Sequence, residues 1–528
     1  MAPRLVILGW DSATFDVTAP LIAEGRLPAL AALQEKGFSA PLRSTWPPMT
    51  DCAWTSAFTG ANPGRHGIFG SWYRAPGAYQ CRYFSSRERR SAALWELGSE
   101  ARFLVWNVPM AFPPSALQGV MVSGYGAPPG ARMCYPDSFQ DRLADRFDLL
   151  DIVDRAPHTS LERFLEDLLR GLEVQAEALS WAAAESDADC VVAVWPHVDR
   201  AQHFMWRFRD SSHPLRNAVE RVYEAMDRAT GKLLERWPDA DFLVVSDHGA
   251  GPLHADVNLG AWLVDKGKAA YGGRRLSPAL RMAWALPPRV RKLGRRLAPV
   301  AARKTLGATV TDQLGPFDWG RTQAFGGING DLWLNLRGRE PLGMVSPQNA
   351  EEIEEELREG MLELRDPRRD APIVRAVHRR DDIYEGPAVT LAPDLIVDMW
   401  SEGYRVAPAR GPSPLVVAPQ PLAGVKEAWS SEHRPLGIFV AAGPRMGTGA
   451  AAELSLLDVC PSALALLECP VPAGLDGRVA TKTFDAGWLA SHPVTPTAAA
   501  AERSSDGDYS DAEAAAVEAH LKDLGYIE

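Results

Sequence analysis

The chain has 528 residues, 46% of them hydrophobic and 23% charged, which excludes bulk disorder and a small disulfide-stapled scaffold. Its net charge of −11 at pH 7 excludes nucleic acid as the primary partner, so an anionic ligand would have to be bound locally by cations. No run of about 18 apolar residues predicts a membrane span. The N-terminus passes directly into an apolar run at Leu5–Gly9 without a signal-peptide pattern, so we expect a cytoplasmic protein with reduced cysteines.

Short apolar runs typical of buried strands recur along the chain, and amphipathic stretches typical of helices separate several of them. The runs are Leu5–Gly9, Phe103–Trp106, Cys190–Trp195, Phe242–Val245, Leu395–Val397 and Ile438–Ala442, and the helical stretches include Leu161–Ala183 and Leu215–Trp237. This alternation predicts an α/β fold with a mostly parallel, doubly wound sheet flanked by helices. Ligands bind such sheets outside the carboxyl ends of the strands, so the polar residues that follow these runs are candidates for the site.

Two stretches break the pattern. Residues 266–304 contain 12 Lys and Arg and no Asp or Glu, which predicts an inserted basic cap over 261–315. A solvated helical hairpin is the simpler interpretation of this cap, and a lid or a membrane-surface patch is the alternative. Residues 486–510, rich in Ala, Ser, Thr and Pro, predict a linker before a helix at 511–524. We therefore expect a catalytic core in two parts, 1–260 and 316–485, with the cap between them and 486–528 as linker and C-terminal helix.

Carboxylates and imidazoles follow three of the predicted strands. Asp11 comes directly after the first strand, and Asp247 and His248 follow the strand at 242–245. Asp199 and His203 follow the strand at 190–195 and, four residues apart, would share one face of a helix. Each of these alone is explained by a turn or a structural pair, but together carboxylates and imidazoles are the ligands that suit zinc or manganese.

The segment 47–60 supplies a candidate nucleophile. Pro47 and Pro48 predict an extended approach, and Thr50 is expected at the N-cap of the helix that follows. A helix N-terminus presents N–H groups and a positive dipole to a phosphate. A Thr hydroxyl becomes a nucleophile near neutral pH only when a metal ion lowers its pKa, so nucleophile and metal ligands explain each other. A simple capping Thr is the alternative.

In order and spacing these motifs resemble the alkaline phosphatase superfamily and, within it, the type I phosphodiesterase/nucleotide pyrophosphatase-like phosphohydrolases. The similarity is carried by Pro48-Met-Thr50 through Thr59-Gly60 to Pro63-Gly-Arg-His66-Gly67-Ile68, by Asp199-Arg-Ala-Gln-His203, by Ser246-Asp247-His248-Gly249 and by Glu432-His433-Arg-Pro-Leu-Gly437. The resemblance implies an alkaline-phosphatase-like fold with an inserted cap. It also adds His433 to the candidate ligands.

The resemblance further implies two divalent metal ions, Zn²⁺ or alternatively Mn²⁺. One ion would be held by Asp11, Thr50, Asp247 and His248, and the other by Asp199, His203 and His433. Thr50 would attack a small-molecule phosphodiester or phosphoanhydride and form a phosphothreonine intermediate.

Other functions are compatible with the same motifs. A phosphomutase similar to cofactor-independent phosphoglycerate mutase, a phosphomonoesterase, and a metal-stabilised binding protein without turnover are the alternatives. Ser71 stands where nucleotide pyrophosphatases have an Asn, so nucleotide specificity is not implied. Cys52-Ala-Trp-Thr-Ser lacks the C-x-P-x-R pattern of sulfatases, which disfavours sulfate esters. His66 is expected to fix a helix-end turn rather than to bind metal.

Overall fold

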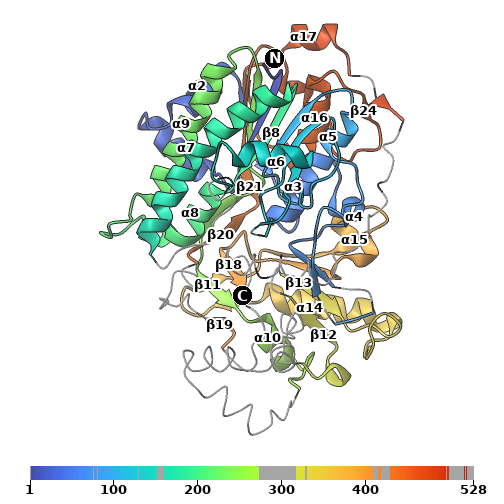
Figure 1. The fold of residues 1–528 in the computed structure, drawn as a ribbon. Helices are drawn as coiled ribbons and strands as arrows, with labels where there is room; N and C mark the ends of the chain where they lie inside the picture. Colours follow the sequence, from blue (N-terminus) through green and yellow to red (C-terminus); the bar gives the residue numbers. More distant parts are fainter. Residues whose placement is uncertain are drawn as a thin grey trace.

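The structure of the protein is a computed structural model, which describes residues 2–74, 77–79, 81–128, 130–149, 152, 160–272, 317–327, 330–407, 414–417, 429–494, 496–498, 503, 517 and 519. Residues 273–304 of the predicted basic run 266–304 lie outside the described residues. The predicted terminal helix 511–524 also lies outside them, apart from residues 517 and 519. Figure 1 shows a large α/β body and a smaller body beneath it.

A long sheet forms the centre of the large body. Its strands follow the order β22-β2-β21-β9-β1-β8-β5-β6-β7, with β23 paired to β2. They are β1 (Leu5–Trp10), β2 (Phe38–Arg43), β5 (Phe103–Trp106), β6 (Gly119–Val122), β7 (Cys134–Tyr135), β8 (Cys190–Trp195), β9 (Asp241–Val245), β21 (Leu436–Ala442), β22 (Gly449–Ala450) and β23 (Leu454–Ser455). The five neighbours from β9 to β6 are parallel, whereas β21 and β7 run antiparallel to them. The predicted mostly parallel sheet is therefore confirmed.

Helices cover both faces of the sheet. One face carries α1 (Phe15–Ala23), α2 (Pro28–Lys36), α7 (Leu161–Ser186), α8 (His197–Met205) and α9 (Ala218–Arg236), and the other carries α3 (Thr50–Thr59), α5 (Leu94–Leu97) and α16 (Val459–Leu466). Figure 1 shows α7, α8 and α9 on the opposite side of the sheet from α3, α5 and α16. The two helices predicted at 161–183 and 215–237 are confirmed within three residues at each end.

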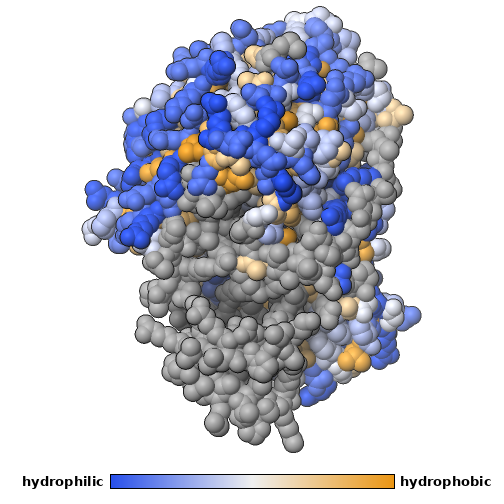
Figure 2. Space-filling model, viewed as in Figure 1, coloured by the Kyte–Doolittle hydropathy of each residue, from blue (hydrophilic) through white to orange (hydrophobic). Residues whose placement is uncertain are grey.

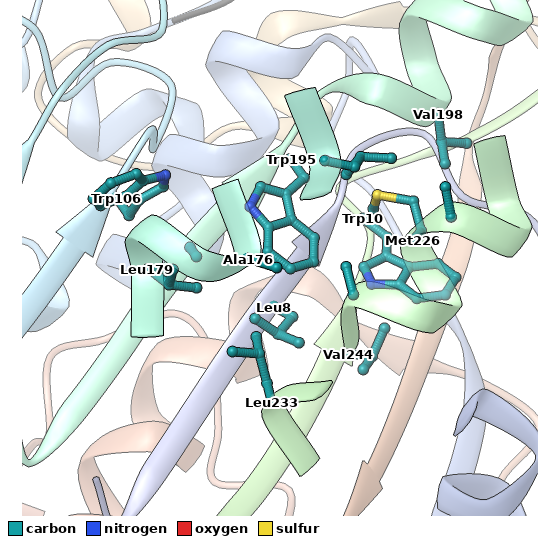
Figure 3. Packing of buried hydrophobic residues seen from close by; sticks show 14 of the residues in the cluster. Leu8, Trp10, Trp106, Ala176, Leu179, Trp195, Val198, Met226, Leu233 and Val244 are labelled. Atoms are coloured by element: carbon teal, nitrogen blue, oxygen red, sulfur yellow. The ribbon is translucent and has the colours of Figure 1, made fainter. Parts of the chain in front are cut away.

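The alternation of side chains along β1 explains this doubly wound arrangement. Val6, Leu8 and Trp10 enter the core beneath α7 and α9, whereas Leu5 and Ile7 enter the core beneath α3 and α16. Figure 3 shows large aromatic side chains in the first core, and each of them ends its strand: Trp10 (β1), Trp106 (β5) and Trp195 (β8). Because these three strands are parallel, the residues that follow them leave the sheet along a common edge.

The smaller body has a core of its own. Its main sheet has the order β12-β13-β17-β16, all antiparallel, from Ala324–Gly326, Asp331–Leu334, Leu395–Asp398 and Ala376–Arg379. A second sheet joins β18 (Tyr404–Val406), β11 (Ala255–Val257) and β19 (Val416–Val417), and α10 (Leu259–Asp265) and α14 (Ala350–Leu362) belong to the same body. The predicted strand 395–397 therefore exists, but its expected place in the parallel sheet is wrong. A short buried apolar run has the same pattern in either kind of sheet, and that pattern does not identify its partner.

Three further observations bear on earlier expectations. The predicted linker begins with a short helix, α17 (Ala486–Ser491). All six cysteines are free and buried, so they pack as small apolar groups. Among the described residues, no helix combines the length and the hydrophobicity that a membrane span requires.

The face of the large body drawn in Figure 2 is mostly hydrophilic, with smaller hydrophobic areas among the charged ones.

Candidate metal centre

The order of the strands places the predicted ligands side by side. In the sheet, β1 lies between β9 and β8, and Gly9 is in register with Val245 while Trp10 is in register with Trp195. The three strands are parallel, so the chain leaves all of them at the same edge of the sheet. This edge therefore carries Asp11, Asp247 with His248, and the start of α8. The structure thus brings together residues that the sequence separates by more than 200 positions.

A ribbon of two strands delivers the last histidine. The strand β20 (Ser431–Arg434) pairs antiparallel with β10 (Gly249–Pro252), which directly follows His248, and His433 is opposite Ala250. The imidazole of His433 stacks on that of His248, with ring centroids 3.7 Å apart. The fold therefore places His433 beside the other candidate ligands.

Asp199, His203 and His433 form one compact group, in which all three side chains are buried. In α8, Asp199 and His203 lie one turn apart on the same face, with Asp199 Oδ1 3.0 Å from His203 Nε2. His433 Nε2 lies 3.7 Å from the same oxygen and 3.1 Å from His203 Nε2. The group therefore presents one carboxylate oxygen and two imidazole nitrogens to a single point.

His248 is the centre of the second group. Its Nε2 lies 3.1 Å from Asp247 Oδ2, 3.3 Å from Thr50 Oγ1 and 4.0 Å from Asp11 Oδ1. The two groups adjoin, because ligand atoms of Asp11, Asp199 and His248 also lie within 4.8 Å of one another. All predicted ligands thus converge on one region that contains the Thr50 hydroxyl.

The expected capping role of Thr50 is wrong. The helix α3 begins at Thr50 itself, and Met49, which occupies the N-cap position, makes no side-chain capping bond to the described residues. The Thr50 hydroxyl is directed at His248 instead. Residue preferences at helix ends do not show whether a hydroxyl bonds the helix backbone or a side chain from elsewhere in the chain. Only the fold brings such a distant side chain within reach.

Backbone carbonyls orient the three imidazoles. The Nδ1 atoms donate to carbonyl oxygens, His203 to Ser431 at 3.2 Å, His248 to Gly249 at 3.1 Å and His433 to Pro48 at 2.8 Å. A carbonyl only accepts, so each Nδ1 carries a hydrogen and each Nε2 can direct its lone pair to the centre. Two lone pairs at the 3.1 Å separation of His203 and His433 repel each other unless a proton or a metal ion lies between them. This is the arrangement expected of metal-binding histidines.

The carboxylates also require cations. Asp11, Asp199 and Asp247 are all buried, and Asp247 Oδ2 accepts no hydrogen bond from the described residues. Within the described part of the chain, no Lys or Arg forms an ion pair with Asp199 or Asp247. Since buried charges are stable only when they are paired or coordinated, the donor set fits divalent metal ions.

The pKa values of Asp199, His203 and His433 also indicate that this group needs a cation. Burial disfavours ionisation of Asp199, but the adjacent imidazoles of His203 and His433 hold the pKa of its carboxyl well below the usual range. Burial also opposes a charge on His433, yet Asp199, with Glu432 and Asp247, raises its pKa to about 9. Burial lowers the pKa of His203 despite the attraction of Asp199. One proton on His433 thus balances the carboxylates, which is a role that a metal ion would take over.

A tryptophan that the sequence motifs did not single out supports the second group. Trp54 lies one turn after Thr50 on α3 and donates its indole N–H to Asp11 Oδ2 at 3.0 Å. Gly9 leaves room for it, because a Cβ there would lie 2.5 Å from Cη2 of Trp54. In the sequence, the i,i+4 spacing of Thr50 and Trp54 indicates that the two side chains share one face of the helix. Only the fold shows that Asp11 faces this side of the helix.

His66 lies outside the centre, as expected. Its Nδ1 accepts a hydrogen bond from the Ile68 N–H at 3.1 Å, and its Nε2 bonds the hydroxyl of Ser56 at 2.7 Å. These contacts hold the turn that ends α4 (Pro63–His66). The predicted structural role of His66 is confirmed.

Comparison with known proteins identifies the family. Residues 5–428 match the family described as type I phosphodiesterase / nucleotide pyrophosphatase. The chain belongs to this family. The match ends before His433, so the place of that residue beside the other candidate ligands rests on the structure. No curated protein matches the sequence.

Solved structures show the same fold. Murine ectonucleotide pyrophosphatase / phosphodiesterase 5 is 11% identical with a TM-score of 0.50, over 91% of this chain and 100% of that one. A phosphonoacetate hydrolase from Sinorhizobium meliloti 1021, solved with phosphonoacetate, is 14% identical with a TM-score of 0.50, over 87% of this chain and 94% of that one. The expected alkaline-phosphatase-like α/β architecture is therefore confirmed.

Proposed function

We propose that this protein is a metal-dependent phosphohydrolase that cleaves a phosphodiester or phosphoanhydride bond in a small-molecule substrate through a phosphothreonine intermediate. The observation that carries the proposal is the convergence of three imidazole Nε2 atoms and three buried carboxylates in one region, where His248 Nε2 lies 3.3 Å from the Thr50 hydroxyl. Membership of the type I phosphodiesterase/nucleotide pyrophosphatase family supports phosphohydrolase activity.

Two divalent ions are proposed, and the proximity of the candidate ligands supports them. Asp199, His203 and His433 would hold one ion, and Asp11, Thr50, Asp247 and His248 would hold the other. Zn²⁺ is the proposed metal and Mn²⁺ the alternative, because mixed imidazole and carboxylate ligands suit both. Ions in these positions would supply Lewis-acid stabilisation of the phosphoryl oxygens and would lower the pKa of the Thr50 hydroxyl.

The residues of the chain supply position and direction for the reaction. Thr50 is the first residue of α3, where the N–H groups of the first turn lack partners within the helix and favour an incoming phosphate. His248 is oriented by its bond to the Gly249 carbonyl, so its Nε2 stays directed at Thr50 Oγ1. The Thr50 hydroxyl loses its proton to solvent, and a bond forms between Thr50 Oγ1 and phosphorus as the bond to the leaving oxygen breaks; the leaving oxygen takes up a proton from solvent. Water then hydrolyses the phosphothreonine, which releases the phosphoryl product and restores the Thr50 hydroxyl.

Replacement of Thr50 tests the proposal. We expect Thr50→Ala to reduce hydrolysis of bis-p-nitrophenyl phosphate, with Zn²⁺ or Mn²⁺ present, by about 10³-fold or more, because the attacking oxygen is lost. Thr50→Ser should retain measurable turnover and a trapped phosphoenzyme. Thr59→Ala is the matched control, since this buried threonine at the other end of α3 bonds, among the described residues, only the Thr55 carbonyl and the Ala61 N–H of the backbone.

Two results would contradict the proposal: wild-type turnover by Thr50→Ala, or full activity after exhaustive chelation. A panel of substrates then tests the substrate class. Faster turnover of monoesters than of diesters would replace the proposed diesterase with a phosphomonoesterase. Transfer of phosphate between positions of phosphoglycerate, without net release, would replace it with a phosphomutase.

A further inference from the structure

A hydrogen-bond network behind the metal centre connects the two groups of candidate ligands. Gln202 lies on α8 between Asp199 and His203, and its side chain is fully buried. Its Nε2 donates to the backbone carbonyl of Ser12 at 2.9 Å and lies 3.2 Å from the Ser12 hydroxyl. Because Ser12 directly follows Asp11, Gln202 joins the helix of the first group to the loop of the second.

Ser12 extends this network to Asp247. The Ser12 N–H donates to Asp247 Oδ1 at 3.1 Å. The other oxygen, Oδ2, accepts no hydrogen bond from the described residues and lies 3.1 Å from His248 Nε2. One oxygen of the carboxylate is therefore held by Ser12, which turns the other toward the position proposed for the ion.

The backbone of Ser12 adopts a conformation that needs this support. Its φ is +66°, in the left-handed region that is unfavourable for a residue with a Cβ. Such a conformation persists when its surroundings over-determine it. The amide of Gln202 supplies part of that constraint, and the Ser12 hydroxyl adds a long contact of 3.4 Å to the Gly249 carbonyl.

Tyr223 of α9 fixes the orientation of the Gln202 amide. The Tyr223 hydroxyl donates to Gln202 Oε1 at 3.2 Å and accepts the Thr14 N–H at 3.1 Å. The amide oxygen thus faces the hydroxyl, and the amide nitrogen faces the Ser12 carbonyl, which only accepts. All of these groups are buried, so the loss of one partner leaves another polar group without a bond.

We propose that Gln202 is a positioning residue that, through Ser12, sets the orientation of the Asp247 carboxylate and so raises the affinity of the group Asp11, Thr50, Asp247 and His248 for its ion. The effect is selective, because Ser12 bonds a ligand of this group, whereas His203 of the other group is oriented by the Ser431 carbonyl. The inference rests on the proposed function, since it takes these residues as metal ligands.

The test is the variant Gln202→Met, which removes the amide and keeps the length of the side chain. Mn²⁺ is titrated into metal-free full-length protein by calorimetry. We expect wild type to bind two equivalents, and we expect Gln202→Met to bind one of them about 10 to 100 times more weakly, the range found when residues that orient metal ligands are replaced. The affinity for the other equivalent should change by less than about threefold.

Gln175→Met is the matched control. Gln175 is also fully buried, on α7, where its Oε1 accepts the Trp106 indole N–H at 3.3 Å and its Nε2 donates to the Ile152 carbonyl at 3.1 Å. The same atoms are lost, but no candidate ligand is touched. We expect a comparable fall in melting temperature and unchanged binding of both equivalents.

The possible outcomes separate the two proposals. Unchanged binding of both equivalents by folded Gln202→Met, or equal weakening of both, overturns the positioning role. Failure of wild type to bind Mn²⁺ or Zn²⁺ overturns the proposed function instead. If Gln202→Met does not fold by circular dichroism, Tyr223→Phe removes only the hydroxyl that holds the amide. This second variant should weaken the same single equivalent by about 3 to 10 times, and no change in it overturns the inference.

Discussion

Replacing Trp54 with phenylalanine would remove one hydrogen bond from the candidate metal centre and leave an aromatic ring in place. The indole N–H of Trp54 donates to Asp11 Oδ2 at 3.0 Å, and both side chains are buried. The ring stacks on Phe58, with centroids 5.5 Å apart and an interplanar angle of 11°. A phenyl ring can keep much of this stacking but cannot donate to Asp11.

The size of the effect follows from the kind of bond that is lost. A hydrogen bond to a charged group contributes about 1.5–3 kcal/mol, and the bond matters here because it holds the carboxylate that is proposed to bind an ion. Since about 1.4 kcal/mol corresponds to a factor of ten, we expect Trp54→Phe to lower metal affinity, and with it kcat/KM at subsaturating metal, by about 10 to 100 times. Saturating Mn²⁺ or Zn²⁺ should restore part of the activity.

The assay compares Trp54→Phe with Trp95→Phe. Trp95 is buried on α5 and its ring lies 6.0 Å from the same Phe58, but its indole N–H has no hydrogen-bond partner among the described residues. Both variants lose similar volume, so both should lower the free energy of unfolding. Only Trp54→Phe should shift the metal titration. Equal metal affinities in the two variants would refute the reasoning and leave Trp54 with a packing role alone.

Two further predictions concern stability. Burial lowers the pKa of His66 to about 3, below the value of about 6.5 expected in the unfolded chain, so the unfolded state takes up a proton first and stability falls as the pH decreases from about 6.5. At pH 5 the lost free energy of unfolding amounts to about 2 kcal/mol. Urea unfolding at pH 7 and pH 5 should show a smaller loss in His66→Gln than in wild type, and a loss equal to that of wild type in a variant of the exposed His492. Equal losses in wild type and His66→Gln would contradict the prediction. Gly9→Ala would place a Cβ 2.5 Å from Trp54, so we expect a destabilisation of about 1–3 kcal/mol and weaker metal binding. Gly231→Ala, where a Cβ would meet only an ordinary contact at 3.5 Å, should not destabilise the protein, and similar unfolding energies for the two glycine variants would argue against the clash.

The positions of most candidate site residues are predictable from the sequence because the patterns that reveal them are local. Asp11 and the Asp247-His248 pair follow buried strands, and the i,i+4 spacing of Asp199 and His203 implies one helix face. Each of these patterns depends on neighbouring residues only. His433 was found through a family resemblance rather than through such a pattern, because it lies in a two-stranded ribbon whose partner, β10, is about 180 residues away in the chain.

The amino-acid sequence by itself determined five strands and two long helices of the large body, the residue types at those strand ends and the family. The tertiary structure decided which groups face one another: Thr50 against His248 rather than at a helix cap, Trp54 against Asp11, and Gln202 against Ser12. It also decided that the strand at 395–398 belongs to the smaller body. The physical reason is the same in each case. Periodicity and end preferences arise from interactions within a few residues, whereas the partner of a buried polar group depends on the order in which distant strands pair in the sheet.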